Sequence, residues 1–203
     1  MDLKASYPSF FYNYVQPHIA QAIEYLSLTD TGRQWNSNLN FHVFCGEHRA
    51  ILSSQGLELL RIISEKLKTE QNFEASLRFI LSKICKFQGW PVGHAYFRSE
   101  NSSGEVSMKP SAVWHLETSS ATLDTFVSVT AKTSFKSGEG LPGRVLASSK
   151  AEWVQDVTMD PNFPRAKLAK DIGVKGAFAF PVTDEYGVRY VLEFFSLNIE
   201  EPD

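Results

Sequence analysis

The chain has 203 residues, of which 43% are hydrophobic and 21% are charged, an ordinary composition for a globular protein of one or two small domains. Its net charge of -3 argues against a nucleic-acid-binding surface, and no apolar run approaches the roughly 20 residues that cross a bilayer. The N-terminus does not have the pattern of a signal peptide, and two cysteines make no disulfide framework, so we expect a cytoplasmic location and no membrane segment in this chain.

The first 55 residues form a segment of their own in the sequence. A helical stripe runs over residues 9–28, a polar loop over 29–40, and a short strand over 41–45. We expect this helical extension to be either the end of a preceding module or an elaboration packed on the domain that follows.

Two helices are predicted between residues 56 and 88. Leu60, Ile63 and Leu67 are spaced three and four apart, as in a packed helix, and Asn72 is placed to cap the second helix. That helix should end before Pro91, because proline disfavours the helical conformation in the residue preceding it. The apolar stripe suits a helix that packs against a second copy, so we expect a homodimer through the helices between Gly56 and Phe87.

From Gly89 onward the hydrophobic period changes to two, which predicts strands. We expect strands at 92–98, 106–116, 152–154, 174–183 and 188–196, with turns at 101–104 and 184–187. Helices are predicted at 119–135, 144–149 and 166–170, and a loop at 138–143. The predicted fold is α+β, with a central antiparallel sheet of five or six strands and helices on both faces.

Five segments in a fixed order carry a resemblance to a known family. They are GEGLPGRV from Gly138, EWVQDV from Glu152, DPNFPRA from Asp160, GVKGAFAFPV from Gly173, and VLEFFS from Val191. From Phe73 onward the chain resembles a GAF domain of the kind attached to bacterial sensor kinases and related signalling enzymes.

The resemblance implies a non-catalytic sensory domain over residues 56–203 that serves bacterial signal transduction. It implies a signal passed to a separate output module, such as a histidine kinase of a two-component system or a nucleotide cyclase. Members of the family carry one more helix after the last strand, and we expect it to be truncated here, since the chain stops at Asp203.

The resemblance also implies a small-molecule pocket between the sheet and the segment 119–170. The candidate lining residues are aromatic or imidazole side chains, although each taken singly is more often a core residue. They are His94, Trp114, His115, Phe126, Trp153, Phe163 and Phe178.

A weak metal pattern lies in the N-terminal segment, where His42, Cys45 and His48 fall within seven residues. A metal site would need a fourth ligand, and the plainer interpretation is a partly buried cysteine beside two surface histidines.

Other chemistry is poorly supported by the sequence. Gly138-x-Gly140-x-x-Gly143 spells a dinucleotide-binding pattern, but it follows a predicted helix rather than a strand and contains Pro142. The cofactor is unknown, and no covalent tetrapyrrole is expected because the last cysteine is Cys85. Two alternatives to ligand sensing stay open, a ligand-free dimerisation spacer and a GAF-fold methionine sulfoxide reductase that would use Cys45 or Cys85.

Overall fold

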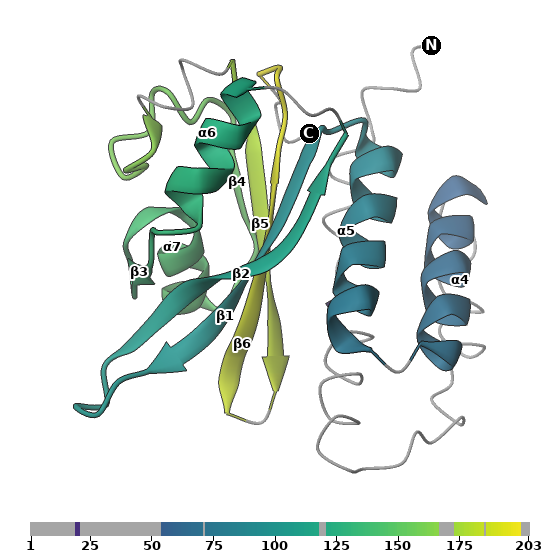
Figure 1. Ribbon diagram of the computed structural model, residues 1–203, viewed down its shortest axis with the longest axis horizontal. Helices are drawn as coiled ribbons and strands as arrows, with labels where there is room; N and C mark the ends of the chain where they lie inside the picture. Colours follow the sequence, from purple (N-terminus) through teal and green to yellow (C-terminus); the bar gives the residue numbers. More distant parts are fainter. Residues whose placement is uncertain are drawn as a thin grey trace.

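A six-stranded antiparallel sheet with helices on both faces forms the centre of the molecule (Figure 1). The computed structural model describes residues 19–20, 54–70, 72–117, 121–166, 173–184 and 186–199. In chain order the elements are α4 (Ser54–Thr69), α5 (Phe73–Gln88), β1 (Val92–Glu100), β2 (Val106–Leu116), α6 (Ala121–Thr130), β3 (Phe135–Lys136), α7 (Gly140–Ser148), β4 (Glu152–Val154), β5 (Ala177–Asp184) and β6 (Gly187–Phe195).

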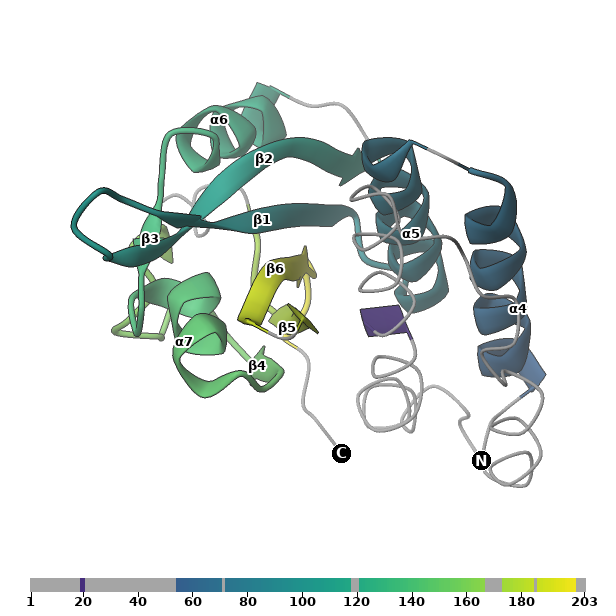
Figure 2. The same cartoon turned by 90° about the horizontal axis from the view of Figure 1, so that it is seen from below.

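The strand order β3-β2-β1-β6-β5-β4 brings the first long strand and the last strand together at the centre of the sheet. The α5 helix covers one face, which we call the α5 face, and α4 packs on the side of α5 that is away from the sheet (Figures 1 and 2). The α6 and α7 helices cover the other face, the α7 face. The predicted fold class is confirmed. Each strand residue points to one face or the other, so β1 and β6 supply side chains to both layers.

The boundaries of α5 follow the predicted capping signals. Asn72 has extended backbone geometry, and its side-chain oxygen accepts a hydrogen bond from the Ala75 amide at 2.9 Å. Gly89 ends the helix in the left-handed conformation, with φ of 71°, which glycine adopts without strain.

The apolar stripe of α4 lies inside the chain. Leu60, Ile63 and Leu67 are almost completely buried and join the hydrophobic cluster formed by α5 and the α5 face of the sheet. The stripe therefore supplies no seam for a second copy, and the observation on which the predicted dimer interface rested no longer supports it.

Ile19, from the N-terminal segment, is fully buried in the same cluster. Both alternatives for the first 55 residues, and the boundary at residue 55, stay predictions.

The predicted and observed elements differ most on either side of β3. The helix expected over 119–135 ends at Thr130, and Phe135 begins β3 instead, where it pairs with Met108 and is fully buried. The loop expected over 138–143 contains the start of α7 at Gly140. Pro142 is tolerated there because the first amides of a helix have no partner within the helix.

None of the helices in the described parts of the chain combines the length and apolar character needed to span a membrane.

Candidate functional site

A cluster of polar side chains is buried on the α7 face of the sheet. His94 of β1 and Glu193 of β6 stand opposite each other in the strand register, and neither is exposed to solvent. Their imidazole Nδ1 and carboxylate Oε1 are 3.3 Å apart. The two central strands therefore place an ionisable pair within the hydrophobic core of this face, next to buried residues such as Tyr96 and Phe195.

Arg165 reaches this pair from the loop between β4 and β5. Its Nη1 and Nη2 donate to Glu193 Oε1 at 3.1 Å and Oε2 at 2.9 Å, and Nη1 also donates to Thr130 Oγ1 at 3.0 Å. Arg165 is 3% exposed, so the guanidinium and the carboxylate form a desolvated, two-bond ion pair.

Four phenylalanine rings surround the Arg165 guanidinium. The ring centroids lie 5.1 to 5.4 Å from its central carbon, within the range of a cation–π contact. We call these rings, Phe126, Phe135, Phe163 and Phe195, the Phe cage.

His94 links the cluster to β2. Its Nε2 lies 3.1 Å from the Ser111 carbonyl oxygen, which can only accept, and the ring stacks on Trp114 at 3.7 Å between centroids. Its Nδ1 faces the Glu193 carboxylate, so the imidazole lies between the β2 backbone and the buried ion pair.

The electrostatics favour the charged forms of the ion pair. Burial by itself would raise the pKa of the Glu193 carboxyl, but the charge of Arg165 and hydrogen bonds from His94 and Arg165 hold that pKa below its ordinary value. Burial likewise opposes the charged form of Arg165, yet the Glu193 charge keeps its pKa raised. Burial raises the pKa of the Tyr96 hydroxyl far above its usual range, so the phenol stays neutral.

Two buried polar atoms in this cluster have no hydrogen-bond partner among the described residues. They are the Arg165 Nε and the Tyr96 hydroxyl. An unsatisfied buried donor is costly, which makes these atoms points where a ligand or water could bond.

The structure separates the predicted site residues between the two faces. His94, Trp114, Phe126 and Phe163 lie on the α7 face, where the pocket was expected. Trp153 and Phe178 pack in the cluster of the α5 face. That these residues bind a ligand stays a prediction.

His115 also lies on the α5 face. It pairs with Gly93, whose α-carbon faces the thiol of Cys85 in α5. Burial, and secondarily the positive charge of Lys86, lower the pKa of His115, while Glu117 acts in the opposite direction.

Sequence reasoning missed the charged centre of the site. Glu193 could have been found as the one carboxylate in the apolar run VLEFF, since a charged residue in a central strand requires a buried partner. Arg165, Tyr96, Thr130, Phe135 and Phe195 carry no comparable local signal.

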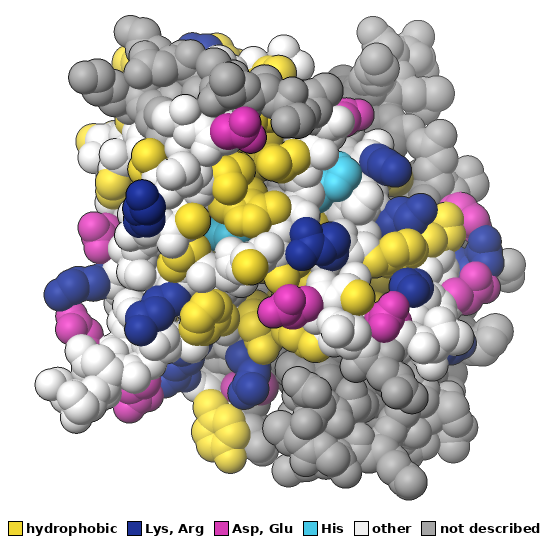
Figure 3. Space-filling view, in the orientation of Figure 1, with side chains coloured by type: hydrophobic (Ala, Val, Ile, Leu, Met, Phe, Trp, Pro, Cys, Tyr) yellow, Lys and Arg dark blue, Asp and Glu magenta, His cyan; other side chains and the backbone are white. Residues whose placement is uncertain are grey.

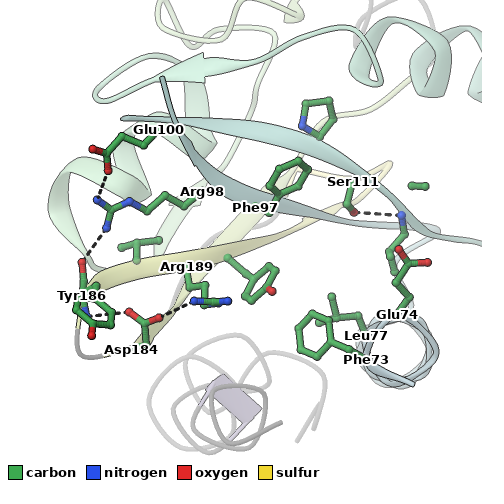
Figure 4. Close-up of a pocket in the computed structure, with 15 residues that line it drawn as sticks. Phe73, Glu74, Leu77, Phe97, Arg98, Glu100, Ser111, Asp184, Tyr186 and Arg189 are labelled. Carbon is green, nitrogen blue, oxygen red and sulfur yellow. Dashed lines mark hydrogen bonds and ion pairs between the residues drawn. The ribbon is translucent and has the colours of Figure 1, made fainter. Parts of the chain in front are cut away.

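A separate groove of about 690 Å³ lies on the α5 face, beyond the start of α5. Phe73 and Leu77 of α5 line one end and Arg98 of β1 lies at the other, with Phe97 between them (Figure 4). Arg98 donates to the Tyr186 carbonyl oxygen at 2.7 Å. None of the predicted site residues lines this groove.

The charges of the groove are largely paired within it. Arg189 bonds to Asp184 at 3.1 Å, and Arg98 lies 3.5 Å from Glu100. Hydrophobic side chains gather over the middle of the face that Figure 3 shows, with lysines and arginines around them. These features do not assemble a catalytic group.

A second cavity, of about 660 Å³, lies beside the edge strand β4. Arg144 lies in it and bonds to Glu152 at 2.5 Å and to Asp160 at 2.8 Å. Its Nη1 also donates to the Asn162 carbonyl oxygen at 2.7 Å. The arginine thereby ties α7 to β4 and to the following loop.

The glycine pattern of residues 138–143 has a structural explanation. A side chain on Gly143 would lie 2.1 Å from the Lys136 carbonyl oxygen, and Gly140 has a φ of +58°. The Gly138 amide donates to the Gly143 carbonyl at 2.8 Å, and Asn162 bonds to both Gly138 and Gly140. The glycines permit this tight approach of backbone to backbone.

The remaining candidates are a metal site and reactive cysteines. His42, Cys45 and His48 lie outside the described residues, and the described ranges contain no group of three metal-ligating side chains. Cys85 is 1% exposed, and burial, helped by the charge of Glu117, raises the pKa of its thiol.

Comparisons with known structures identify the same fold in other proteins. The GAF domain of A. aeolicus nlh2 in an inactive state is 19% identical and has a TM-score of 0.54, with 73% of this chain and 82% of that one covered. The GAF domain of the Coxiella burnetii phosphoenolpyruvate-protein phosphotransferase is 18% identical, with a TM-score of 0.54 and coverage of 72% and 81%. The free methionine-R-sulfoxide reductase of Neisseria meningitidis, in complex with its substrate, is 18% identical, with a TM-score of 0.53 and coverage of 75% and 80%.

Sequence comparisons assign the two parts of the chain separately. No curated protein matches the chain. Residues 1–49 match a family described as Npun_R2479-like, and residues 66–200, about two thirds of the chain, match the GAF domain of NLP proteins. The chain belongs to the NLP protein GAF domain family.

Proposed function

We propose that this chain is a non-catalytic sensory or regulatory domain whose buried cluster receives the signal, in bacterial signal transduction. The observation that carries the proposal is the desolvated Arg165–Glu193 pair on the α7 face, with Arg165 Nε and the Tyr96 hydroxyl unsatisfied beside it. Membership of a GAF family supports a regulatory role.

The energetics of the cluster support a role other than stability. A buried ion pair commonly contributes no more than well-packed apolar residues of the same volume, because both charges lose their hydration. Two polar atoms of the cluster, the Arg165 Nε and the Tyr96 hydroxyl, are also unbonded, which adds a further cost. A bound ligand, or a rearrangement of the pair, would relieve that cost.

The strands offer a direct route from the cluster to the helices. Glu193 lies on the α7 face, while its neighbours Leu192 and Phe194 pack in the cluster of the α5 face. A movement of β6 at Glu193 therefore shifts the side chains that support α5 and, through it, α4. A separate output module would respond to these helices.

The ligand-free spacer remains the second candidate, and one observation favours it. The Phe cage and the Arg165 side chain pack closely on the α7 face, where a ligand was expected. In that case the cluster would hold α6, β3 and β6 together and bind nothing.

A sulfoxide reductase activity is disfavoured by the position of Cys85. The thiol lies on the α5 face, against Gly93, and burial suppresses its nucleophilic thiolate form. The likeness to the Neisseria enzyme is a likeness of fold.

Native mass spectrometry of the full chain, with an absorption spectrum of the same sample, tests the proposal. A retained ligand would add mass to the folded protein that disappears on denaturation, and the Glu193→Gln variant should lose it. The spacer would be favoured if the wild-type protein carries no added mass and if no compound in a screened ligand collection raises its melting temperature. Mass retained equally by Glu193→Gln would place the ligand elsewhere. The same spectrum reports whether the chain is a dimer.

A further inference from the structure

The surroundings of the Arg165 guanidinium have the composition of a binding site for an organic cation. Four ring faces and one carboxylate face the same positive group, and the carboxylate is completely buried. Aromatic cages of this kind recognise guanidinium and alkylated ammonium groups, and their attraction grows when water is excluded.

The cage does not depend on the segment that carries Arg165. Phe126 belongs to α6, Phe135 to β3, and Phe195 and Glu193 to β6, while only Phe163 comes from the same loop as Arg165. Removing the Arg165 side chain therefore leaves most of the cage and its carboxylate in place.

An anion fits this site less well than a cation. Both terminal nitrogens of Arg165 already bond to Glu193, so an anion would find only Nε and would lie close to a carboxylate. The faces of the phenylalanine rings are also negative, which disfavours an anion and attracts a cation.

We propose that the Phe cage and Glu193 form a recognition site for guanidinium-type cations, that Arg165 is its resident ligand, and that a free guanidinium or alkylammonium group takes the same place when Arg165 is withdrawn. This inference rests on the proposed function in treating the cluster as the receiving site. It adds the class of ligand and makes Arg165 an internal competitor.

The Arg165→Ala variant of the full chain tests the chemistry of the cage. The probe is methylguanidinium chloride, with sodium chloride and neutral methylurea at the same concentrations as controls. At ten times its Kd, methylguanidinium should raise the melting temperature of the variant by about 3–6 °C relative to sodium chloride. Wild-type protein should show no such rise, because its cage is filled.

Two further samples show whether charge is the cause. The Arg165→Ala/Glu193→Gln variant should lose the rise, since the carboxylate is neutralised. Methylurea has nearly the same shape without the charge and should give no rise. An equal rise with methylurea, or a full rise in the double variant, would show that the probe only fills a cavity and would overturn the inference.

A second measurement covers the case in which Arg165→Ala does not fold. Arg165→Lys keeps a cation in the cage, whereas Arg165→Met keeps only an apolar stem. The lysine variant should retain a higher melting temperature than the methionine variant, and equal or reversed values would contradict the inference.

The outcomes also separate this inference from the proposed function. If methylguanidinium rescues Arg165→Ala while wild-type protein retains and responds to nothing, the cage chemistry stands and the sensory role fails. If wild-type protein binds a ligand that is not cationic, the sensory role stands and the cage inference fails.

Discussion

Arg165 and Glu193 meet through two parallel hydrogen bonds of 3.1 and 2.9 Å, and neither side chain is more than 3% exposed. The arginine comes from a loop and the glutamate from a central strand, so their pairing fixes that loop on the α7 face. Because both charges are desolvated, the charged form of each residue is stabilised by the opposite charge of the other.

The first prediction concerns the energy of this pair. Arg165→Met and Glu193→Leu should each lower the free energy of unfolding by about 3–5 kcal/mol, because each leaves one buried charge uncompensated. The double variant Arg165→Met/Glu193→Leu should cost less than the sum of the two by about 2 kcal/mol or more, since no charge remains. Urea unfolding of the four proteins measures this, and strictly additive losses would show that the two charges do not interact.

A pH dependence follows from the lowered pKa of Glu193. Below its ordinary pKa of 4.5 the unfolded chain takes up the proton before the folded chain does. The stability from the carboxylate is therefore complete above pH 4.5 and falls as the pH drops, by at most about 1.4 kcal/mol per pH unit, down to the folded-state pKa.

The Glu193→Gln variant isolates this contribution from those of the other carboxyl groups. Its free energy of unfolding should fall less steeply than that of the wild type between pH 4.5 and the folded-state pKa. Parallel curves for the two proteins would mean that Glu193 titrates in the folded state as it does in the unfolded chain.

His115 provides a prediction on the opposite face. Its pKa should lie below 6.5, first because of burial and second because of Lys86. Lys86→Met should raise that pKa, and Glu117→Gln should lower it further, since Glu117 favours the charged imidazole. Titration of the imidazole carbon-bound protons by NMR measures all three proteins, and a shift of the same sign in both variants would contradict the assigned causes.

The element order was predictable because its signals are local. The Asn72 cap, the turn before β2 and the alternation in β1 are each read within a few residues of sequence. The end of α6 was not predictable in this way, because Phe135 leaves the helix to pair with Met108, 27 positions before it in the chain.

Four of the predicted site residues lie around the buried cluster, but the charged centre of that cluster was not predictable. The alternation of side chains along a strand shows that His94 and Tyr96 share a face of the sheet. It does not show which face Trp153 and Phe178 occupy, because that depends on the register between distant strands. Charged residues are usually at the surface, and the burial of Arg165 depends on Glu193, 28 residues away. The apolar stripe of α4 shows the same limit of sequence-based prediction. A periodic pattern indicates that one face of a helix is buried, but it does not indicate which part of the structure buries it.

Replacing Gly143 by alanine should change the stability in the direction opposite to that of most glycine-to-alanine substitutions in helices. Alanine in place of glycine within a helix normally stabilises it by about 1 kcal/mol. Gly143→Ala should instead destabilise the protein, because the new carbon would lie 2.1 Å from the Lys136 carbonyl oxygen. Gly138→Ala is the matched control, since nothing lies within 4 Å there and only its φ of +84° opposes the change.

The control should cost about 1–2 kcal/mol from backbone strain alone, and Gly143→Ala should cost more. Urea unfolding distinguishes them. A stabilised Gly143→Ala would mean that β3 and α7 separate easily, and that the close backbone approach is not required by the fold.

The last prediction concerns the thiol of Cys85 and bears on the reductase alternative. In a Cys45→Ser variant, Cys85 is the only thiol, and it should react with a disulfide reagent at least about a thousandfold more slowly in buffer than in urea, because reaction requires opening of the core. Adding Gly93→Ala should speed the reaction, since the new carbon would lie 2.9 Å from the sulfur and push the thiol from its place. A fast reaction in the Cys45→Ser variant alone would show that the thiol is accessible in the native protein, and a reductase mechanism through Cys85 would then have to be considered again.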